Sequence, residues 1–453
     1  MSRILVSGCQ VVVTMDDAGT ELAGASVLVE DGVVAWVGTG EPPGGRAGAY
    51  VIDGRGTVAL PGLVNTHHHL YQVLTRVRAQ DAGLFDWLVH LYPIWAGLTE
   101  DHVRAAARAG LAELALSGCT TAADHHYLFP LDAGDCLGAS IEAAAEVGLR
   151  FHPTRGSMDL GASSGGLPPD EVVESTETAL DATAAALDAW HDPGPGAMVR
   201  VGVAPCSPFS VSEALLKGAA ELARDRGVRL HTHLAETADE TERCLAERGC
   251  RPVEWLDRLG WLGDDVWLAH CVHLDTAEIA RFAEAGVGVA HCPTSNLRLG
   301  SGFAPAPELV AAGAPVGLGV DGSASNDGGN LLAEARQAML VARGRLGPAA
   351  MDARGALRLA TRGGAAVLGR DDLGRLSPGL RADLTLFRVD TLPYAGSAPD
   401  PVAALVLCAP QRAWHVLVDG RTVVAGGELA TLDERAVAAE AASASRELLE
   451  GIG

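Results

Sequence analysis

Two histidines in the sequence are spaced so that they can share one metal ion. His67 and His69 lie two residues apart in a stretch with strand composition, so both imidazoles leave the same face while His68 leaves the other. An isolated His-x-His pair is weak evidence for a metal. It gains weight from further candidates at the ends of other predicted strands, which are His231, His233, His270, His273, His291 and Asp321.

These residue types predict a particular chemistry. Imidazole and carboxylate ligands together suit zinc or a similar first-row divalent ion, and they disfavour calcium and magnesium. Such an ion lowers the pKa of a bound water from about 15.7 to about 7, which gives hydroxide at neutral pH. Glu236 follows His233 by three residues, and its carboxylate can take a proton from water and pass it to a leaving nitrogen. The pattern predicts attack of a metal-activated water on a polarised carbon.

The elements that must position these residues alternate along the middle of the chain. Apolar runs rich in Val, Leu and Ala precede longer segments with helical spacing, as in βα units with a parallel sheet. Eight such units favour a (β/α)8 barrel, in which the carboxyl ends of all strands open onto one face. The candidate strands are 63–69, 120–126, 150–156, 198–205, 228–236, 266–274, 287–295 and 316–322.

Local signals support this division. The segment from Thr99 to Leu116 predicts a helix with Thr99 as N-cap and two acidic residues in its first turn. Short strands and hairpin turns at Asp31-Gly32 and Asp419-Gly420 mark both ends of the chain as β-rich. We expect a composite β-sandwich domain from residues 1–58 and 371–430, the barrel over 59–370, and a helical tail over 431–453.

Composition excludes several classes of function. The net charge of −23 opposes binding to nucleic acid and to anionic membranes. The nine cysteines are scattered singly, which is typical of reduced thiols in a cytosolic protein. No signal peptide and no run of eighteen apolar residues is present. We therefore expect a soluble, cytoplasmic protein.

Several motifs together resemble the deaminase and triazine-hydrolase branch of the amidohydrolase superfamily. They are Leu60-Pro-Gly-Leu-Val-Asn-Thr-His-His-His69, His233-Leu-Ala-Glu236, Ala269-His-Cys271, Gly319-Val-Asp-Gly-Ser-Ala-Ser-Asn-Asp327 and Leu376-Ser-Pro-Gly-Leu-Arg-Ala-Asp383. The resemblance implies one zinc ion, or Fe²⁺, bound by His67, His69, His233 and Asp321. It also implies that Glu236 shuttles protons, that His270 contacts the hydroxide or the tetrahedral intermediate, and that Asp321 doubles as general base. His68, His231, His273 and His291 are then expected to be structural or to support the ligands.

The substrate follows from a narrower resemblance. Residues 65–72, 85–88, 116–127 and 204–210 resemble the 8-oxoguanine deaminase group of that branch, which implies conversion of 8-oxoguanine to urate and ammonia. We expect three residues to contact the substrate ring. Gln72 offers it a hydrogen-bond donor and an acceptor, Arg155 meets a ring carbonyl, and Phe209 stacks on the ring. The aromatic residues between positions 71 and 95 are expected to form a pocket wall or lid.

Several alternatives compete with this interpretation, and some of them stay open. Other branches bridge two metals with a carbamylated lysine on the fourth strand, but the chain's one lysine, Lys217, falls on the helix predicted from Ser212 to Arg226. The zinc deaminases with Pro-Cys-x-x-Cys are disfavoured, because Pro205-Cys206 has no second cysteine three residues on. Hydrolysis of an s-triazine, or deamination of guanine, a pterin or an adenosine derivative, stays open. A non-catalytic oligomeric scaffold is the remote alternative. Homo-oligomerisation is expected from the resemblance alone.

Overall fold

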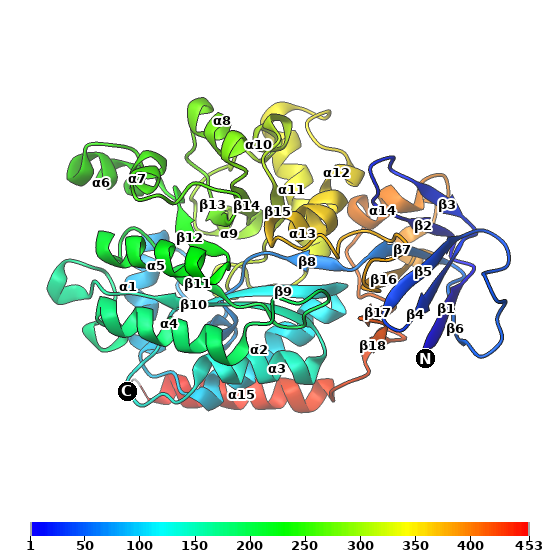
Figure 1. Cartoon of the computed structure of the whole chain (residues 1–453), viewed down its shortest axis with the longest axis horizontal. Coiled ribbons are helices and arrows are strands. Elements are labelled where there is room, and N and C mark those ends of the chain that lie inside the picture. The colour runs from blue at the N-terminus through cyan, green and yellow to red at the C-terminus, as the bar shows by residue number, and fades with distance from the viewer. Residues whose placement is uncertain (1, 452–453) are drawn as a thin grey trace.

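A closed barrel of eight parallel strands forms the centre of the computed structural model, which describes residues 2–451. Neighbouring strands pair in chain order, and the eighth strand closes onto the first (Figure 1). This confirms the predicted (β/α)8 barrel. The strands are β8 (Leu63–Asn65), β9 (Cys119–His126), β10 (Arg150–Ser157), β11 (Gly202–Pro205), β12 (Leu230–Leu234), β13 (Val266–His270), β14 (Gly288–His291) and β15 (Val316–Leu318).

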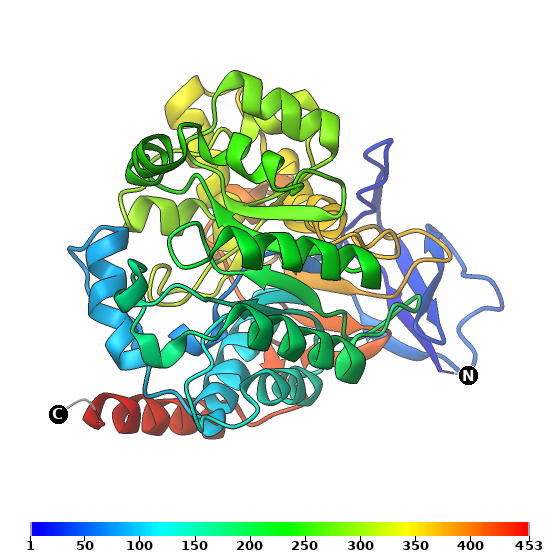
Figure 2. The ribbon, with the colours of Figure 1, turned by 60° about the vertical axis from the view of Figure 1, so that its left-hand side comes forward.

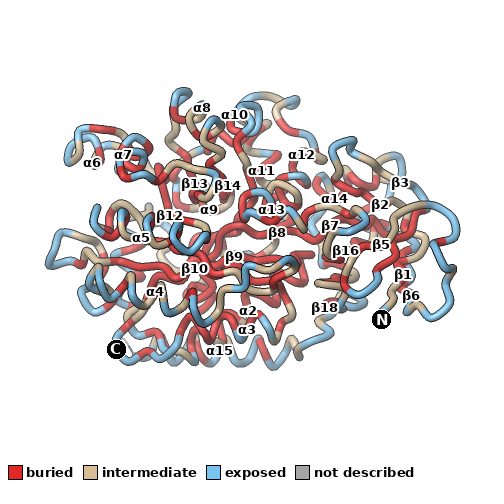
Figure 3. Tube along the Cα trace, viewed as in Figure 1, coloured by how far each residue is buried: buried red, intermediate tan, exposed pale blue. Residues whose placement is uncertain are grey.

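Helices surround the barrel, so its strands are covered on both faces (Figure 2). Every residue of β9 and β10 is buried, as expected for a parallel sheet between a packed interior and a helical layer. Figure 3 shows this as buried strands inside exposed outer helix surfaces and loops. The surrounding helices include α2 (Glu100–Leu116), α3 (Cys136–Val147), α4 (Thr176–Trp190), α5 (Glu213–Arg226), α6 (Ala238–Arg248), α7 (Pro252–Arg258), α8 (Thr276–Ala285), α10 (Ala306–Ala312) and α11 (Leu331–Leu346).

The predicted helix start at Thr99 is confirmed. Its side chain accepts a hydrogen bond from the His102 amide, and α2 runs from Glu100 to Leu116. The first barrel strand differs from its prediction, because β8 ends at Asn65 and the metal-binding histidine candidates follow it. Pairing continues past the strand end, since the Asp321 amide donates to the His67 carbonyl at 3.1 Å. His67 is therefore fixed by backbone contacts although it lies outside the strand.

Both chain ends contribute strands to a second, β-rich region beside the barrel (Figure 1). One sheet has the order β5-β4-β1-β6 and the other β19-β18-β17-β16-β7-β2-β3. Asp31-Gly32 and Asp419-Gly420 have positive φ at both positions, which suits the predicted tight hairpin turns. The residue limits given above for the domains stay a prediction. The strands are β1 (Arg3–Ser7), β2 (Val11–Val13), β3 (Glu21–Ala23), β4 (Ser26–Glu30), β5 (Val33–Gly38), β6 (Tyr50–Asp53), β7 (Thr57–Pro61), β16 (Leu384–Arg388), β17 (His415–Val418), β18 (Arg421–Ala425) and β19 (Glu428–Leu429).

The last helix, α15 (Glu434–Glu450), returns to the barrel and lies along α2 in both ribbon views. Arg108 of α2 pairs with Glu440 at 2.7 Å, and Ser445 Oγ donates to the Leu74 carbonyl at 2.6 Å. Short helices complete the chain: α1 (Leu84–Trp95), α9 (Pro293–Arg298), α12 (Ala353–Arg358), α13 (Gly364–Val367) and α14 (Pro401–Leu407). Within residues 2–451, none of the helices has the length and apolar character needed to span a bilayer.

Candidate metal centre and active site

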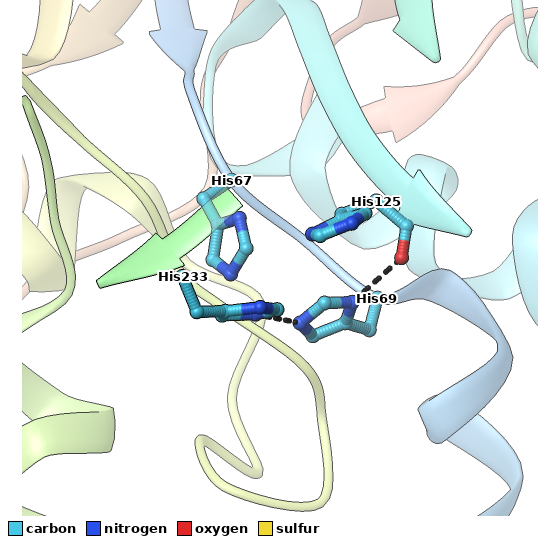
Figure 4. A group of neighbouring side chains, drawn as sticks. All are labelled: His67, His69, His125 and His233. Atoms are coloured by element: carbon cyan, nitrogen blue, oxygen red, sulfur yellow. Dashed lines mark hydrogen bonds between the residues drawn. The ribbon is translucent and has the colours of Figure 1, made fainter. Parts of the chain in front are cut away.

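The four predicted metal ligands meet at the carboxyl-terminal end of the barrel strands. His67 and His69 follow β8, His233 lies on β12, and Asp321 follows β15. Asp321 Oδ1 lies 3.3 Å from His67 Nε2 and 3.5 Å from His69 Nε2, and the Nε2 atoms of His69 and His233 are 3.0 Å apart. Figure 4 shows the three imidazoles converging. These separations suit donor atoms that surround a single ion.

The protonation of the ligand imidazoles fits a metal. The Nδ1 of His69 donates to the His125 carbonyl at 2.7 Å, and the Nδ1 of His233 donates to the Cys206 carbonyl at 2.6 Å. Each Nε2 therefore carries a lone pair. Burial lowers the pKa of His233 to about 3, so its ring is neutral. Two lone pairs that face each other need a cation between them, and the buried Nε2 of His67 has no hydrogen-bond partner among the described residues.

Asp321 is held rigidly at the edge of the cluster. Its Oδ2 accepts from the hydroxyls of Ser295 at 2.6 Å and Ser325 at 3.0 Å, and its Oδ1 accepts from the Gly322 amide at 2.7 Å. Burial raises the pKa of Asp321, but the contact with His67 and the neighbouring imidazoles hold that pKa well below its usual range. The φ of 64° at Asp321 is uncommon for a non-glycine residue and is the kind of backbone strain found at functional sites.

Two further predicted residues lie beside Asp321. His270 Nε2 is 3.7 Å from Glu236 Oε2 and 3.9 Å from Asp321 Oδ2, and its Nδ1 bonds to Asn296 Oδ1 at 2.9 Å. Burial raises the pKa of Glu236. Burial lowers the pKa of His270, but the carboxylates of Glu236 and Asp321 outweigh it and leave that pKa above its usual value. Both Glu236 and His270 therefore hold a proton more readily than they would in water, which suits them to proton transfer.

Glu240 positions the backbone that carries Glu236, and the sequence reasoning missed it. Its two carboxylate oxygens accept from the amides of Ala235 at 2.7 Å and Glu236 at 2.9 Å. Ala235 has a φ of 51°, so this turn is held in a left-handed conformation. The Thr237-x-x-Glu240 spacing of a capping box was a signal for a helix start here. The carboxylate instead reaches back beyond Thr237, to the turn that carries Glu236.

A cavity opens above the cluster. Gln72 and Phe209 line it, as predicted, and the aromatic segment contributes Trp87 and Tyr92 to its wall. Phe85 packs edge-on against Phe209 at 4.9 Å between ring centres. The other lining residues are His69, Leu84, Leu88, Tyr127, Cys206, Ser207, His233, Glu236, Glu240, His270, Leu299, Asp321 and Ser325.

Arg155 was predicted to contact the substrate, and the structure places it elsewhere. Its guanidinium forms a bidentate pair with Glu174 at 2.6 and 2.8 Å and lies 3.8 Å from the ring centre of Phe129. It faces a separate depression that Phe129 and Trp190 also line. Because Glu174 already compensates its charge, this arginine serves packing rather than ring recognition.

The histidines without an assigned role divide into two groups. His231 supports a ligand directly, since its Nε2 lies 2.9 Å from His67 Nδ1 and its ring stacks on Trp267 at 4.4 Å. His125, to which the sequence reasoning gave no role, lies within reach of the same ligand cluster (Figure 4). The other three have separate surroundings. His68 packs against α2, His273 bonds to the Ser301 carbonyl, and His291 is the last residue of β14.

Comparison with known proteins agrees with this geometry. The amidohydrolase family profile matches residues 58–423. An 8-oxoguanine deaminase of Pseudomonas aeruginosa is 47% identical over 453 residues, covering 100% of both chains. A hydroxydechloroatrazine ethylaminohydrolase of Pseudomonas sp. (strain ADP) is 38% identical, covering 100% of this chain and 97% of the relative.

A solved structure extends the likeness to three dimensions. The crystal structure of atrazine chlorohydrolase TrzN from Arthrobacter aurescens TC1, complexed with zinc, superposes with a TM-score of 0.93 at 38% identity. The superposition covers 98% of this chain and 100% of that one. The barrel, the ligand cluster and these full-length matches agree with the resemblance inferred from the motifs. The chain belongs to the amidohydrolase family, and it is a metal-dependent hydrolase that acts on C–N bonds.

Proposed function

We propose that the chain is a zinc-dependent aminohydrolase of purine-like heterocycles and that it converts 8-oxoguanine and water to urate and ammonia. The observation that carries the proposal is the joint placement of Asp321, Glu236 and His270 on the floor of a cavity walled by flat aromatic rings. The 47% identity to an 8-oxoguanine deaminase over both full chains supports the choice of ring.

One zinc ion fits the donor set, with Fe²⁺ as the alternative metal. His67, His69, His233 and Asp321 would hold it, because their donor atoms converge and burial lowers the pKa of each imidazole. Zinc in such a site supplies a nucleophilic water at neutral pH and polarises the carbon under attack. The absence of a lysine from the fourth strand argues for one ion rather than a lysine-bridged pair.

The protein side chains divide the proton transfers. Asp321 is ionised, so it accepts a proton from the attacking water. Glu236, whose pKa is raised by burial, carries protons to the ring and to the leaving amine. Against the effect of burial, the carboxylates of Glu236 and Asp321 raise the pKa of His270 and so favour its protonated form, which stabilises negative charge that develops on the oxygen. Ammonia leaves as the former amino carbon becomes a carbonyl.

The cavity walls account for binding a flat ring. Phe209 and Trp87 present aromatic faces or edges to the cavity, which suits a planar heterocycle. Gln72 presents a carboxamide, and its Oε1 is held 3.4 Å from the Ala324 amide. This orientation leaves amide hydrogens of Gln72 to meet a ring carbonyl. Arg155 is not part of this proposal.

A second candidate uses the same machinery with another ring. The 38% identity to an ethylaminohydrolase and the superposition on TrzN favour removal of an amine or another substituent from an s-triazine. The metal ligands and the proton carriers do not distinguish a purine from a triazine. The shape of the cavity wall is the feature that distinguishes the two rings.

The experiment is a screen for released ammonia with the zinc-loaded enzyme. The substrates are 8-oxoguanine, guanine, isoxanthopterin, an adenosine derivative and an aminotriazine, and urate is followed by its absorbance for the first. We expect the highest kcat/KM with 8-oxoguanine. If only triazines or nucleosides react, the choice of substrate is wrong. If none reacts although zinc is bound, the aminohydrolase proposal itself is wrong.

A further inference from the structure

A second depression lies at the opposite end of the barrel from the metal centre. Its walls come from the segments just before β11, β12 and β13 and from the first half of β10. These are the amino-terminal ends of the strands, which do not carry the active site in such barrels. Its polar lining comprises His152, His191, Arg200, Arg224, Arg229, Asp264 and Asp265.

Two of these arginines form no direct ion pair with a carboxylate, although acidic residues lie near both. Neither Arg200 nor Arg229 forms a salt bridge with any residue in the described range 2–451. Arg200 donates only to the carbonyls of Gly194 at 3.2 Å and Gly369 at 3.3 Å, and Arg229 donates only to the Asp264 carbonyl at 2.8 Å. The Nε of each is buried without a partner in the same range. A guanidinium has five donors, so most of them remain available.

Other buried arginines of the chain are satisfied differently. Arg150, which is fully buried, pairs with Asp383 at 2.8 Å and with Asp419 at 2.7 Å. Arg370 pairs with Asp372 at 2.8 Å. Burying a charge is unfavourable unless it is paired. In a chain with a net charge of −23, two partly buried arginines without acidic partners in one depression indicate that an external anion completes the pairing.

A buried histidine forms the floor between them. His152 is 3% exposed, it lines the depression, and its Nδ1 has no hydrogen-bond partner within residues 2–451. Its ring packs edge-on against Trp267 at 5.6 Å between centres. Burial lowers the pKa of His152, and the charges of Arg370, Arg229 and Arg200 lower it further. A neutral imidazole can donate to an oxyanion.

Acidic groups also border the depression, and they limit what it can hold. Asp265 is paired with Arg224 at 3.0 Å, so this pair is neutral overall. Asp265 and Asp264 lower the positive potential at Arg229, and Asp372, Asp371 and Asp192 lower it at Arg200, without forming an ion pair with either guanidinium. The donors without a carboxylate in direct contact are therefore confined to Arg200, Arg229 and His152. Their arrangement suits a compact group with several acceptor oxygens better than an extended polyanion.

We infer that this depression is a phosphate-binding site, occupied by free phosphate or by the phosphate group of a nucleotide and held by Arg200, Arg229 and His152. Phosphate carries up to two negative charges and offers oxygens to both guanidinium groups at once. Binding there supplies an anionic acceptor to two guanidinium groups that have no carboxylate in direct contact. The site is separate from the catalytic cavity, and it does not depend on the substrate proposed above.

Calorimetric titration of the zinc-loaded enzyme in a phosphate-free buffer tests the inference. The probes are inorganic phosphate and, in a second titration, guanosine 5′-monophosphate. We expect one saturable phosphate site per chain, with affinity at least tenfold weaker in Arg229→Gln and in Arg200→Gln. Arg258→Gln is the matched control, because Arg258 is an exposed arginine that pairs with Glu254 at 2.6 Å. Its affinity should equal that of the wild type.

A circular-dichroism spectrum and a zinc content equal to those of the wild type show that each variant is folded, because neither arginine lies in the catalytic centre. Two variants keep the test valid if one of them does not fold. Tighter, arginine-dependent binding of the nucleotide identifies a nucleotide phosphate as the occupant, and weaker binding identifies free phosphate. The inference is overturned if no saturable binding occurs up to roughly 10 mM phosphate, or if phosphate binds equally well to both arginine variants.

Discussion

Replacing Glu240 by Gln tests how the turn that carries Glu236 is held. The wild-type carboxylate satisfies two buried amides, those of Ala235 and Glu236, at 2.7 and 2.9 Å. Glutamine keeps one acceptor oxygen, but its NH₂ group opposes the other amide. A buried donor without a partner costs about 1 to 3 kcal/mol. If the turn relaxes to recover that energy, Glu236 leaves its place beside His270.

The expected loss of activity follows from this energy. At 1.36 kcal/mol per factor of ten, kcat should fall between about fivefold and about 150-fold, with little change in KM. The measurement belongs at pH 8, because burial raises the pKa of Glu240 to about 7 and the wild-type carboxylate must be ionised. Ammonia release gives the rate constants, and elemental analysis gives the zinc content.

The matched control is a second glutamate on the same helix. Glu242→Gln changes an exposed carboxylate on the same helix, α6, and should leave kcat unchanged. If Glu240→Gln keeps kcat within twofold of the wild type, the turn does not need this carboxylate. If it loses zinc instead, Glu240 supports the ligand His233 rather than Glu236.

Three other changes probe the site and its surroundings. Glu236→Gln should retain zinc but lower kcat by at least about a hundredfold, since general acid–base catalysis contributes about 10²- to 10⁴-fold; near-normal turnover would remove it from the mechanism. Gly322→Ala places a Cβ 1.9 Å from Gln72 Oε1, so KM should rise with zinc retained, and an unchanged KM would show that Gln72 does not bind the ring. Burial raises the pKa of Asp124 from 3.8 to about 7, so the folded chain binds the extra proton and stability falls as pH rises from about 4 to 7. At pH 8 the free energy of unfolding of Asp124→Asn, measured by denaturant titration, should therefore exceed that of the wild type by up to about 4 kcal/mol. At pH 4 the two free energies should be equal. A difference that does not depend on pH would contradict this.

The barrel was predictable because its signal is local and repeated. Each strand is a short apolar run, and each strand end carries the residue that chemistry needs, as in His233, His270 and Asp321. Parallel strands bring these ends together whatever their separation in the chain. Position at the strand ends therefore gave a set of candidates, and the resemblance to the amidohydrolase superfamily selected the four ligands from it, even though β8 ends before His67.

The supporting contacts were not predictable, because they depend on how loops return to the barrel. Glu240 reads as an ordinary helix-start residue, and only the fold of the preceding turn aims it at the Ala235 and Glu236 amides. From the sequence, Arg155 was predicted to contact the substrate. In the structure it pairs with Glu174, nineteen residues later in the chain. His231 shows the same limit, since its bond to His67 joins residues 164 positions apart.

The central claim, one catalytic metal per chain, is tested most directly by titrating zinc into the metal-free enzyme while ammonia release from the reactive substrate is followed. Free and bound zinc are separated by dialysis and measured by elemental analysis. The arrangement of His67, His69, His233 and Asp321 predicts that activity rises in proportion to bound zinc and reaches its plateau at one ion per chain. A plateau at two tightly bound ions, or ammonia release that persists without metal, would contradict it.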